Sequence, residues 1–207
     1  MRLVPVLLSE RDVRAVLKMD ELVGAMELAL EQFSAGAVRQ PLRSVIEVPD
    51  PHAFFASMPA YTGRPAALGT KLVTVYHSNS ERDLPSHLAT IVLMDPETGA
   101  LLAIVDGRYI TEARTAAVSA AATRRLARAD ARVLAVFGSG VQARSHIEAL
   151  RLARAFEEIR IWSRTPAHAD ALASELPDEV RPLVRRADSG QAAAAGADVI
   201  ALVTASR

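Results

Sequence analysis

The sequence contains no cysteine, which excludes disulfide bonds, thiolate metal sites and a cysteine nucleophile. The histidines could still ligate a metal, but they are scattered and no two of them stand at i, i+4 spacing. They are His52, His77, His87, His146 and His168. We therefore expect no metal site.

Aromatic residues and excess charge are also scarce. Phe, Trp and Tyr make up 4% of a chain that is 50% hydrophobic, so the core should be mainly aliphatic. The 24 basic residues balance 24 acidic ones, and no basic stripe of the kind that binds nucleic acid is present. We expect no nucleic-acid partner.

Long apolar runs are absent as well. The apolar run within residues 1–12 is interrupted early by charged residues and is too short for a signal peptide or a membrane span. We therefore expect no membrane association and a cytoplasmic location.

The first half of the chain reads as two helices followed by a sheet. Ser9 can cap a short helix over 10–18, and a second helix opens at Asp20 and ends at Gly36. Residues 43–105 then hold short runs of Val, Ile and Leu separated by turn residues, with 95–99 as a hairpin loop. This pattern of short apolar runs predicts a largely antiparallel or mixed sheet with the two preceding helices packed on it.

The second half alternates strands with helices. Thr111 is the predicted cap of an Ala-rich helix over 112–127. After it come predicted strands at 131–137, 158–163 and 198–203, with a weaker candidate at 180–185. A turn and helix are predicted at 138–153, and further helices at 168–175 and 189–195. Such alternation predicts βαβ units and a parallel sheet.

A glycine-rich turn follows the predicted strand 131–137. Its residues are Gly138, Ser139, Gly140, Val141, Gln142 and Ala143, which match G-x-G-x-x-G/A. The first glycine permits a tight turn, the second lets the backbone approach a pyrophosphate, and the small third residue lets helix pack on strand. Because a strand precedes the turn and a helix and strand follow it, the pattern predicts dinucleotide binding.

The residues after the second predicted strand bear on which dinucleotide binds. An NAD-binding unit usually carries a carboxylate there for the ribose 2′-hydroxyl, whereas this chain has Ser163, Arg164 and Thr165. An arginine can pair with a 2′-phosphate, and the hydroxyls can bond to it. The sequence therefore favours NADP(H) over NAD(H); the alternative is that Arg164 is a solvated loop cation and the cofactor is NAD(H).

Four polar residues stand in otherwise apolar or Ala-rich surroundings. They are Arg43, Lys71, Arg114 and Thr115. Taken singly, each is more often a surface residue than a ligand. If the cations converge, they would suit a carboxylate substrate, which arginine binds as a planar fork.

These residues fall within segments that resemble the ornithine cyclodeaminase/mu-crystallin family over essentially the whole chain. The segments are QPLRSV (40–45), SMPAYTG (57–63), GTKLVTVY (69–76), LPSHLATIVLMDPETGALLAIVDG (84–107), ITEARTAAVSAAAT (110–123), VFGSGVQARSH (136–146) and IRIWSRT (159–165). The resemblance is strongest to the mu-crystallin-like (ketimine reductase) branch.

The resemblance implies an α/β fold with two domains in a homodimer. An amino-terminal α+β substrate-binding and dimerisation domain would cover 1–115, and a Rossmann dinucleotide-binding domain would cover 116–207. We expect the Rossmann domain to be truncated at its carboxyl end, because the chain stops after a fourth strand, about half of the expected domain.

The resemblance also assigns roles to single residues. Arg43 and Arg114 match arginines that bind the substrate carboxylate, and Lys71 matches a lysine near the reacting carbon. Met58 and His87 match positions near the substrate pocket. Thr115 and Gly138–Ala143 match residues that contact the cofactor phosphates. Ser163, Arg164 and Thr165 match the residues that select NADP over NAD, which we call the selector.

The expected activity is the NAD(P)H-dependent reduction of a cyclic imino acid, of the pyrroline-2-carboxylate or piperideine-2-carboxylate type, to the cyclic amino acid. Alternatives are conversion of L-ornithine to L-proline and ammonia, alanine dehydrogenation, an NADP-dependent small-molecule binding protein, and an inactive fragment. Two features of the family, a downstream Asp used by cyclodeaminases and a carboxyl-terminal segment that returns to the first domain, lie outside this sequence.

Overall fold

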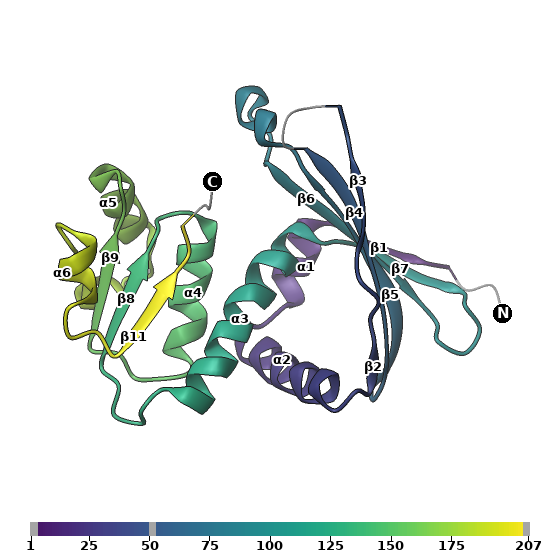
Figure 1. The fold of residues 1–207 in the computed structure, drawn as a ribbon, viewed down its shortest axis with the longest axis horizontal. Coiled ribbons are helices and arrows are strands. Elements are labelled where there is room, and N and C mark those ends of the chain that lie inside the picture. Colours follow the sequence, from purple (N-terminus) through teal and green to yellow (C-terminus); the bar gives the residue numbers. More distant parts are fainter. Residues whose placement is uncertain (1–3, 50–52, 205–207) are drawn as a thin grey trace. The chain divides into compact units, whose positions relative to one another are not determined.

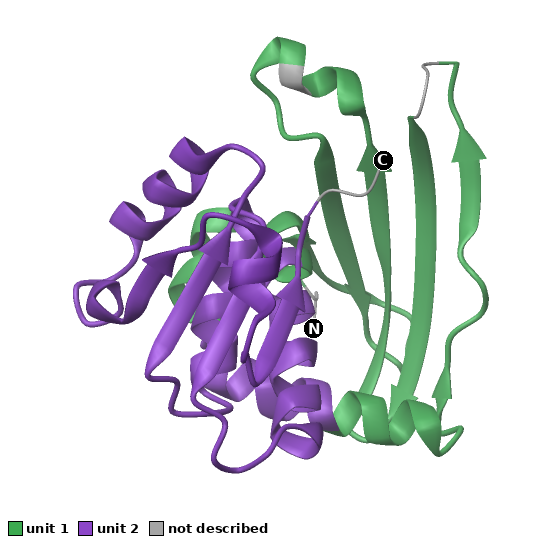
Figure 2. Cartoon of the chain, turned by 60° about the vertical axis from the view of Figure 1, so that its left-hand side comes forward, with its two compact units in different colours: residues 1–17, 28–111 green, residues 18–27, 112–207 purple. Residues whose placement is uncertain are grey.

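The computed structural model describes residues 4–49 and 53–204, which form two compact units. Unit 1 comprises residues 1–17 and 28–111, and unit 2 comprises residues 18–27 and 112–207 (Figure 2). Two helices run across this division, α2 (Met19–Ser34) and α3 (Arg108–Leu126).

Unit 1 is built on a seven-stranded sheet (Figure 1). The strand order is β1-β7-β6-β5-β4-β2, and β3 also pairs with β4. All neighbours are antiparallel except β1 and β7, which confirms the predicted mixed sheet. The strands are β1 (Val6–Leu8), β2 (Val38–Arg39), β3 (Ser44–Glu47), β4 (Phe54–Gly63), β5 (Ala66–Val75), β6 (His87–Met94) and β7 (Leu101–Asp106), with the 3-10 helix η1 (His77–Arg82) between β5 and β6.

One face of this sheet holds its core. Residues directly opposite each other in antiparallel strands share a face, and the register places the buried residues Ala56, Val73 and Ala89 together. The carboxyl part of α2 lies on this face, since Thr62 Oγ1 donates to Gln32 Oε1 at 2.6 Å. Helix α1 (Glu10–Val16) packs against β1 and β7. The early helices therefore pack on the sheet as predicted.

Several predicted helix and loop ends of unit 1 are confirmed. The Ser9 hydroxyl accepts from the Asp12 N–H while the Asp12 carboxylate accepts from the Ser9 N–H, which makes a capping box for α1. Gly36 follows α2 with φ of 72°, in the left-handed conformation that commonly ends a helix. In the 95–99 loop the Asp95 carboxylate accepts from two backbone N–H groups.

The predicted cap of the Ala-rich helix is wrong. Helix α3 begins at Arg108 rather than after Thr111, and the Thr111 N–H donates to the Gly107 carbonyl inside the first turn. The capping acceptor is Asp106, whose Oδ1 lies 3.0 Å from the Arg108 N–H. Asp is as good a cap as Thr, so the earlier residue can start the helix.

Unit 2 contains a four-stranded parallel sheet, as predicted. Its order, β10-β9-β8-β11, is 3-2-1-4 when the strands are numbered along the chain, the arrangement of the first four strands in a dinucleotide-binding fold. The elements are β8 (Val133–Phe137), α4 (Val141–Arg151), β9 (Glu158–Trp162), α5 (Pro166–Glu175), η2 (Arg181–Leu183), β10 (Val184–Arg186), α6 (Gly190–Ala194) and β11 (Val199–Leu202).

The core of unit 2 is aliphatic. Its fully buried side chains include Leu134, Ile147, Ile159 and Ile161. The weak strand candidate at 180–185 was only partly right, because the short 3-10 helix η2 occupies Arg181–Leu183 and β10 begins at Val184. Pro182 explains the difference, since proline has no N–H for a strand ladder and its φ is fixed.

Candidate functional site

The chain leaves β8 through Gly138, which has a φ of 129°. A Cβ on this residue would lie 2.7 Å from the carbonyl oxygen of Val203, just beyond β11. Both the conformation and the space require glycine. The turn is therefore fixed at the point where the strand order reverses between β8 and β11, where doubly wound sheets bind ligands.

Gly140, at the amino end of α4, is the second notable position. Among residues 4–49 and 53–204, no side chain caps this helix, and a Cβ on Gly140 would meet nothing within 4 Å. No acidic residue stands in its first turn. Ser9 and Ser189, in contrast, cap α1 and α6. The first N–H groups of α4 and its positive dipole end are thus available to an anion that approaches over Gly140.

The rest of the turn also fits a bound ligand. Ala143 is fully buried, as the close packing of α4 on the sheet requires. The Oε1 atom of Gln142 is buried and has no hydrogen-bond partner among the described residues. Because an unpaired buried acceptor is unfavourable, a ligand that brings a hydroxyl or an amide N–H would satisfy it.

The predicted selector follows β9. The Ser139 hydroxyl donates to the Ser163 hydroxyl at 3.0 Å, which joins the glycine-rich turn to this segment. Arg164 is exposed and forms no ion pair within residues 4–49 and 53–204. Thr165 precedes α5 without capping it through its side chain, and α5 has no acidic residue in its first turn. The segment therefore presents hydrogen-bond donors and positive charge.

Two aromatic rings lie at the ends of the central strands β8 and β9. Sequence reasoning gave them no role. Phe137 and Trp162 lie with their ring centroids 5.6 Å apart. A Cβ on Gly190 would lie 3.2 Å from the Phe137 ring, so α6 starts close against this pair. Both rings lie at the carboxyl edge of the sheet, where the glycine-rich turn and segment 163–165 begin.

In unit 1, Lys71 lies on the covered face of the sheet. Its direct partners are Met58 in β4 and Ile91 in β6, so these three side chains share a face with a spacing of about 5 Å between neighbouring Cα atoms. Lys71 and Met58 are both half-buried. The structure thus brings together two of the predicted substrate residues.

The other predicted residues of unit 1 stand at different distances from Lys71. Arg43 is exposed and immediately precedes Ser44, which pairs with Ser57, so it adjoins the Met58 position. His87 pairs with Val75, four residues along β5 from Lys71 or about 13 Å at 3.3 Å per residue. His87 shares the face of Lys71 but does not lie beside it.

In unit 2, Arg114 and Thr115 are consecutive residues of α3. Arg114 is exposed and Thr115 is half-buried. Neighbouring residues of a helix point about 100° apart, because a turn takes 3.6 residues. The two side chains therefore point into different surroundings, and their separate roles remain predictions.

The sequence profile of the ornithine cyclodeaminase/mu-crystallin family matches residues 3–207. The chain belongs to this family. Rat ketimine reductase mu-crystallin is 43% identical over 208 residues, which cover 99% of this chain and 65% of the rat protein. The chain thus spans about two thirds of the length of this relative.

Solved structures agree with the family assignment. The Δ1-pyrroline-2-carboxylate reductase of Thermococcus litoralis, in complex with NADH and L-proline, matches with a TM-score of 0.89 and 34% identity over 95% of this chain and 61% of that one. An archaeal alanine dehydrogenase dimer with bound NAD matches with a TM-score of 0.88 and 28% identity over 97% and 60%.

This family member also has a buried polar cluster that sequence reasoning missed. Ser145 Oγ donates to Glu112 Oε1 at 2.6 Å, and Ser119 Oγ lies 3.0 Å from His146 Nε2. The His146 Nδ1–H donates to the Gln142 carbonyl at 2.7 Å. Since that carbonyl can only accept, Nε2 of the neutral ring accepts from Ser119. The seven-residue spacing of 112 and 119 on one helix was the available signal.

The burial of His146 predicts acid sensitivity. Burial lowers the pKa of His146, against the smaller opposing effect of the hydrogen bond to Gln142. Above the unfolded-state pKa of about 6.5 the ring is neutral in both states. Below it, the unfolded chain binds a proton before the folded chain does, so the free energy of unfolding should fall by up to about 1.4 kcal/mol per pH unit until the folded pKa is reached.

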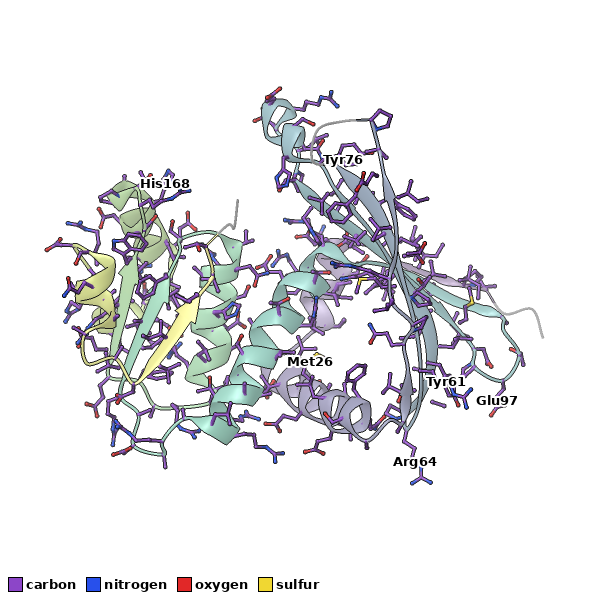
Figure 3. All side chains as sticks on the ribbon, in the orientation of Figure 1. Met26, Tyr61, Arg64, Tyr76, Glu97 and His168 are labelled. Atoms are coloured by element: carbon purple, nitrogen blue, oxygen red, sulfur yellow. The ribbon has the colours of Figure 1, made fainter. Side chains whose placement is uncertain are left out.

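Urea unfolding between pH 7.5 and 5 checks this prediction. His146→Gln should remove part of the acid-dependent loss. His168→Gln should not, because His168 projects from the surface of α5 (Figure 3). An unchanged pH profile in His146→Gln would contradict the prediction.

Two further features concern metals and membranes. Within residues 4–49 and 53–204, no group of three His, Asp or Glu side chains is placed to hold a metal ion; His52 lies outside these residues. In the same ranges, no helix has the length and apolar character needed to cross a membrane.

Proposed function

We propose that this chain acts as an NADP(H)-dependent reductase that converts a cyclic imino acid into the corresponding cyclic amino acid. The observation that carries the proposal is the open glycine-rich turn at the switch point of a 3-2-1-4 parallel sheet, in a family that includes named ketimine and pyrroline-2-carboxylate reductases. A cytoplasmic location remains a prediction from the sequence.

A nicotinamide dinucleotide fits the residues of unit 2. Its pyrophosphate would lie over Gly140 at the uncapped end of α4, with Gly138 shaping the turn and Thr115 as a further phosphate contact. The buried Gln142 Oε1 would gain a donor from the ligand. When bound, the nicotinamide supplies the hydride.

The substrate would be held by its carboxylate. We propose Arg43, Arg114 and Lys71 as substrate contacts, with the arginines binding the carboxylate and fixing the orientation of the imine carbon. The reaction adds a hydride to carbon and a proton to nitrogen. Lys71 would orient the imine and favour the protonated nitrogen, which is the better hydride acceptor. Met58 would pack against the apolar ring, and His87 would stand further along the same face.

A substrate panel tests the activity. NADPH oxidation should be measured with Δ1-pyrroline-2-carboxylate and Δ1-piperideine-2-carboxylate, and NAD(P)⁺ reduction with L-ornithine and L-alanine. Turnover of a cyclic imine supports the proposal. Turnover confined to ornithine or alanine replaces it by cyclodeamination or alanine dehydrogenation, and tight cofactor binding without turnover favours a binding protein.

Arg164→Ala should raise the Kd for NADPH by about 10–100-fold and leave that for NADH nearly unchanged, because a charge-assisted hydrogen bond contributes about 1.5–3 kcal/mol. Fluorescence titration measures both constants. Arg132→Ala is the matched control, since Arg132 precedes β8 at the opposite edge of the sheet and pairs with Glu157. A preference of the unaltered chain for NADH, or equal losses for both cofactors, contradicts the selector.

We also propose that the chain forms a homodimer through unit 1. The sheet face opposite to Lys71 carries large apolar side chains that remain exposed, which is typical of a surface covered by a partner. Leu7 is 76% exposed, Ile46 58%, Leu88 40% and Tyr61 36%. Of these, Tyr61 is labelled in Figure 3.

A further inference from the structure

Two hydrogen bonds, one buried and one partly buried, join α3 to α4 inside unit 2. On α3 they start from Glu112 and Ser119, seven residues or about two helical turns apart, so both residues lie on one side of the helix. On α4 they end at the adjacent residues Ser145 and His146, which are 3% and 4% exposed. We call these four residues the α3–α4 clamp.

The clamp reaches the two elements that we assign to the cofactor phosphates. Ser119 Oγ lies 3.4 Å from the carbonyl oxygen of Thr115, one turn earlier on α3. His146 Nδ1 lies 2.7 Å from the carbonyl oxygen of Gln142, one turn earlier on α4 and inside the glycine-rich turn. Because the single proton of the Ser119 hydroxyl goes to His146 Nε2, the carbonyl contact at Thr115 adds no second hydrogen bond. The hydrogen bonds run from Ser119 through His146 to Gln142, and Thr115 is connected to them by the turn of α3 that separates it from Ser119.

The packing around the clamp makes these contacts specific. Small residues on α3 are fully buried, which lets the helix approach its neighbours closely: Ala113, Ala116, Ala117 and Ala120. Glu112, Ser145 and His146 are buried and Ser119 is half-buried, so a buried clamp residue that loses its partner keeps most of its desolvation cost and the paired arrangement is preferred. The clamp therefore selects one position of α3 relative to α4.

We propose that the α3–α4 clamp positions Thr115 relative to the glycine-rich turn, so that both elements contact the cofactor phosphates as one preorganised site. The clamp residues touch no ligand; they act through Thr115 and Gln142. The proposal rests on the proposed function in one respect, namely that a nicotinamide dinucleotide binds at Gly138–Ala143.

A double-mutant cycle tests this coupling. The Kd for NADPH is measured for the unaltered chain, Ser119→Ala, Thr115→Val and the double variant. Each single change should raise the Kd for NADPH by about 5–10-fold. The Kd of the double variant should stay within about twofold of the Kd of Thr115→Val, because the effects of two changes that act through one contact do not add. The proposal would be overturned if the fold-increase in Kd of the double variant equalled the product of the two single increases, or if Ser119→Ala left Kd unchanged.

Thr123→Ala is the matched control. Thr123 is also a buried hydroxyl residue of α3, but it donates at 2.8 Å to the Ser119 carbonyl within its own helix. Its loss should lower the melting temperature without raising Kd. If Thr123→Ala raises Kd as much as Ser119→Ala does, the effect is general destabilisation and the clamp proposal fails.

A second measurement needs no cofactor. Ser119→Ala should accelerate amide hydrogen exchange over 140–146, at the start of α4, but not over 166–170, at the start of α5. Unchanged exchange at 140–146 overturns the clamp whatever the chain binds. If the unaltered chain binds neither NADPH nor NADH, the proposed function fails separately.

Discussion

Lys71→Met is expected to lower kcat for cyclic imine reduction by about 10²–10⁴-fold, the usual range for a group that aids proton transfer. Methionine is one atom shorter than lysine and replaces most of its apolar stem, so packing against Met58 and Ile91 on the covered face of the sheet should persist. The proposed cofactor contacts all belong to unit 2, whereas Lys71 belongs to unit 1. The Kd for NADPH should therefore stay within about twofold, since no direct contact is lost.

The sequence supplies an unusually clean control, because the chain has only one other lysine. Lys18 is exposed and pairs with Glu21 on the surface of α2, so Lys18→Met should leave both kcat and Kd unchanged. Initial rates at saturating NADPH and fluorescence titration measure the two constants. Equal losses of turnover and of cofactor affinity, or a retained rate, would show that Lys71 has no direct part in the chemistry.

The parts of the fold that could be predicted are those with local signals. The strand predicted at 131–137 is β8 at Val133–Phe137, and the strand predicted at 158–163 is β9 at Glu158–Trp162. The glycine-rich turn between them depends on residues adjacent in sequence, so its conformation follows from Gly138 and its neighbours. The cap of α3 was misassigned because Asp106 and Thr111 are both suitable caps. The observed start coincides with a tertiary contact that the sequence does not show, the hydrogen bond from the Gly107 N–H to the Ala89 carbonyl.

The parts that could not be predicted depend on contacts between distant residues. Alternation indicates which residues of one strand share a face, but register decides which residue of the next strand lies opposite. Lys71 therefore could not be placed beside Met58, or four positions from His87, before β4, β5 and β6 were paired. The Ser119–His146 bond spans 27 residues, so the seven-residue spacing of Glu112 and Ser119 on one helix could not identify the partner of either residue on α4.

Gly138→Ala and Gly140→Ala should separate the folding role of the turn from its binding role. At Gly138 a Cβ would meet the Val203 carbonyl oxygen at 2.7 Å, and φ is 129°. The free energy of unfolding should fall by about 2–4 kcal/mol, because strained backbone and overpacking each cost about 1–3 kcal/mol. NADPH binding should be lost with the turn.

Gly140→Ala should give the opposite pattern. Its Cβ meets no atom of the described residues within 4 Å, so the free energy of unfolding should change by no more than about 0.5 kcal/mol. The same open space is where the pyrophosphate would approach the backbone, so the Kd for NADPH should rise by about 10–100-fold, or about 1.4–2.8 kcal/mol. Urea unfolding and fluorescence titration separate the two effects.

Gly24→Ala is the reference substitution, since a Cβ at this position on α2 also meets no atom within 4 Å and has no proposed ligand nearby. Gly24→Ala should raise the free energy of unfolding by about 0.5–1 kcal/mol, because alanine favours a helix interior over glycine by this amount. The affinity for NADPH should not change. If Gly140→Ala binds NADPH as tightly as Gly24→Ala, the open end of α4 is not where the pyrophosphate lies. The cofactor assignment would then lose its main structural support, while the steric account of Gly138 would stand.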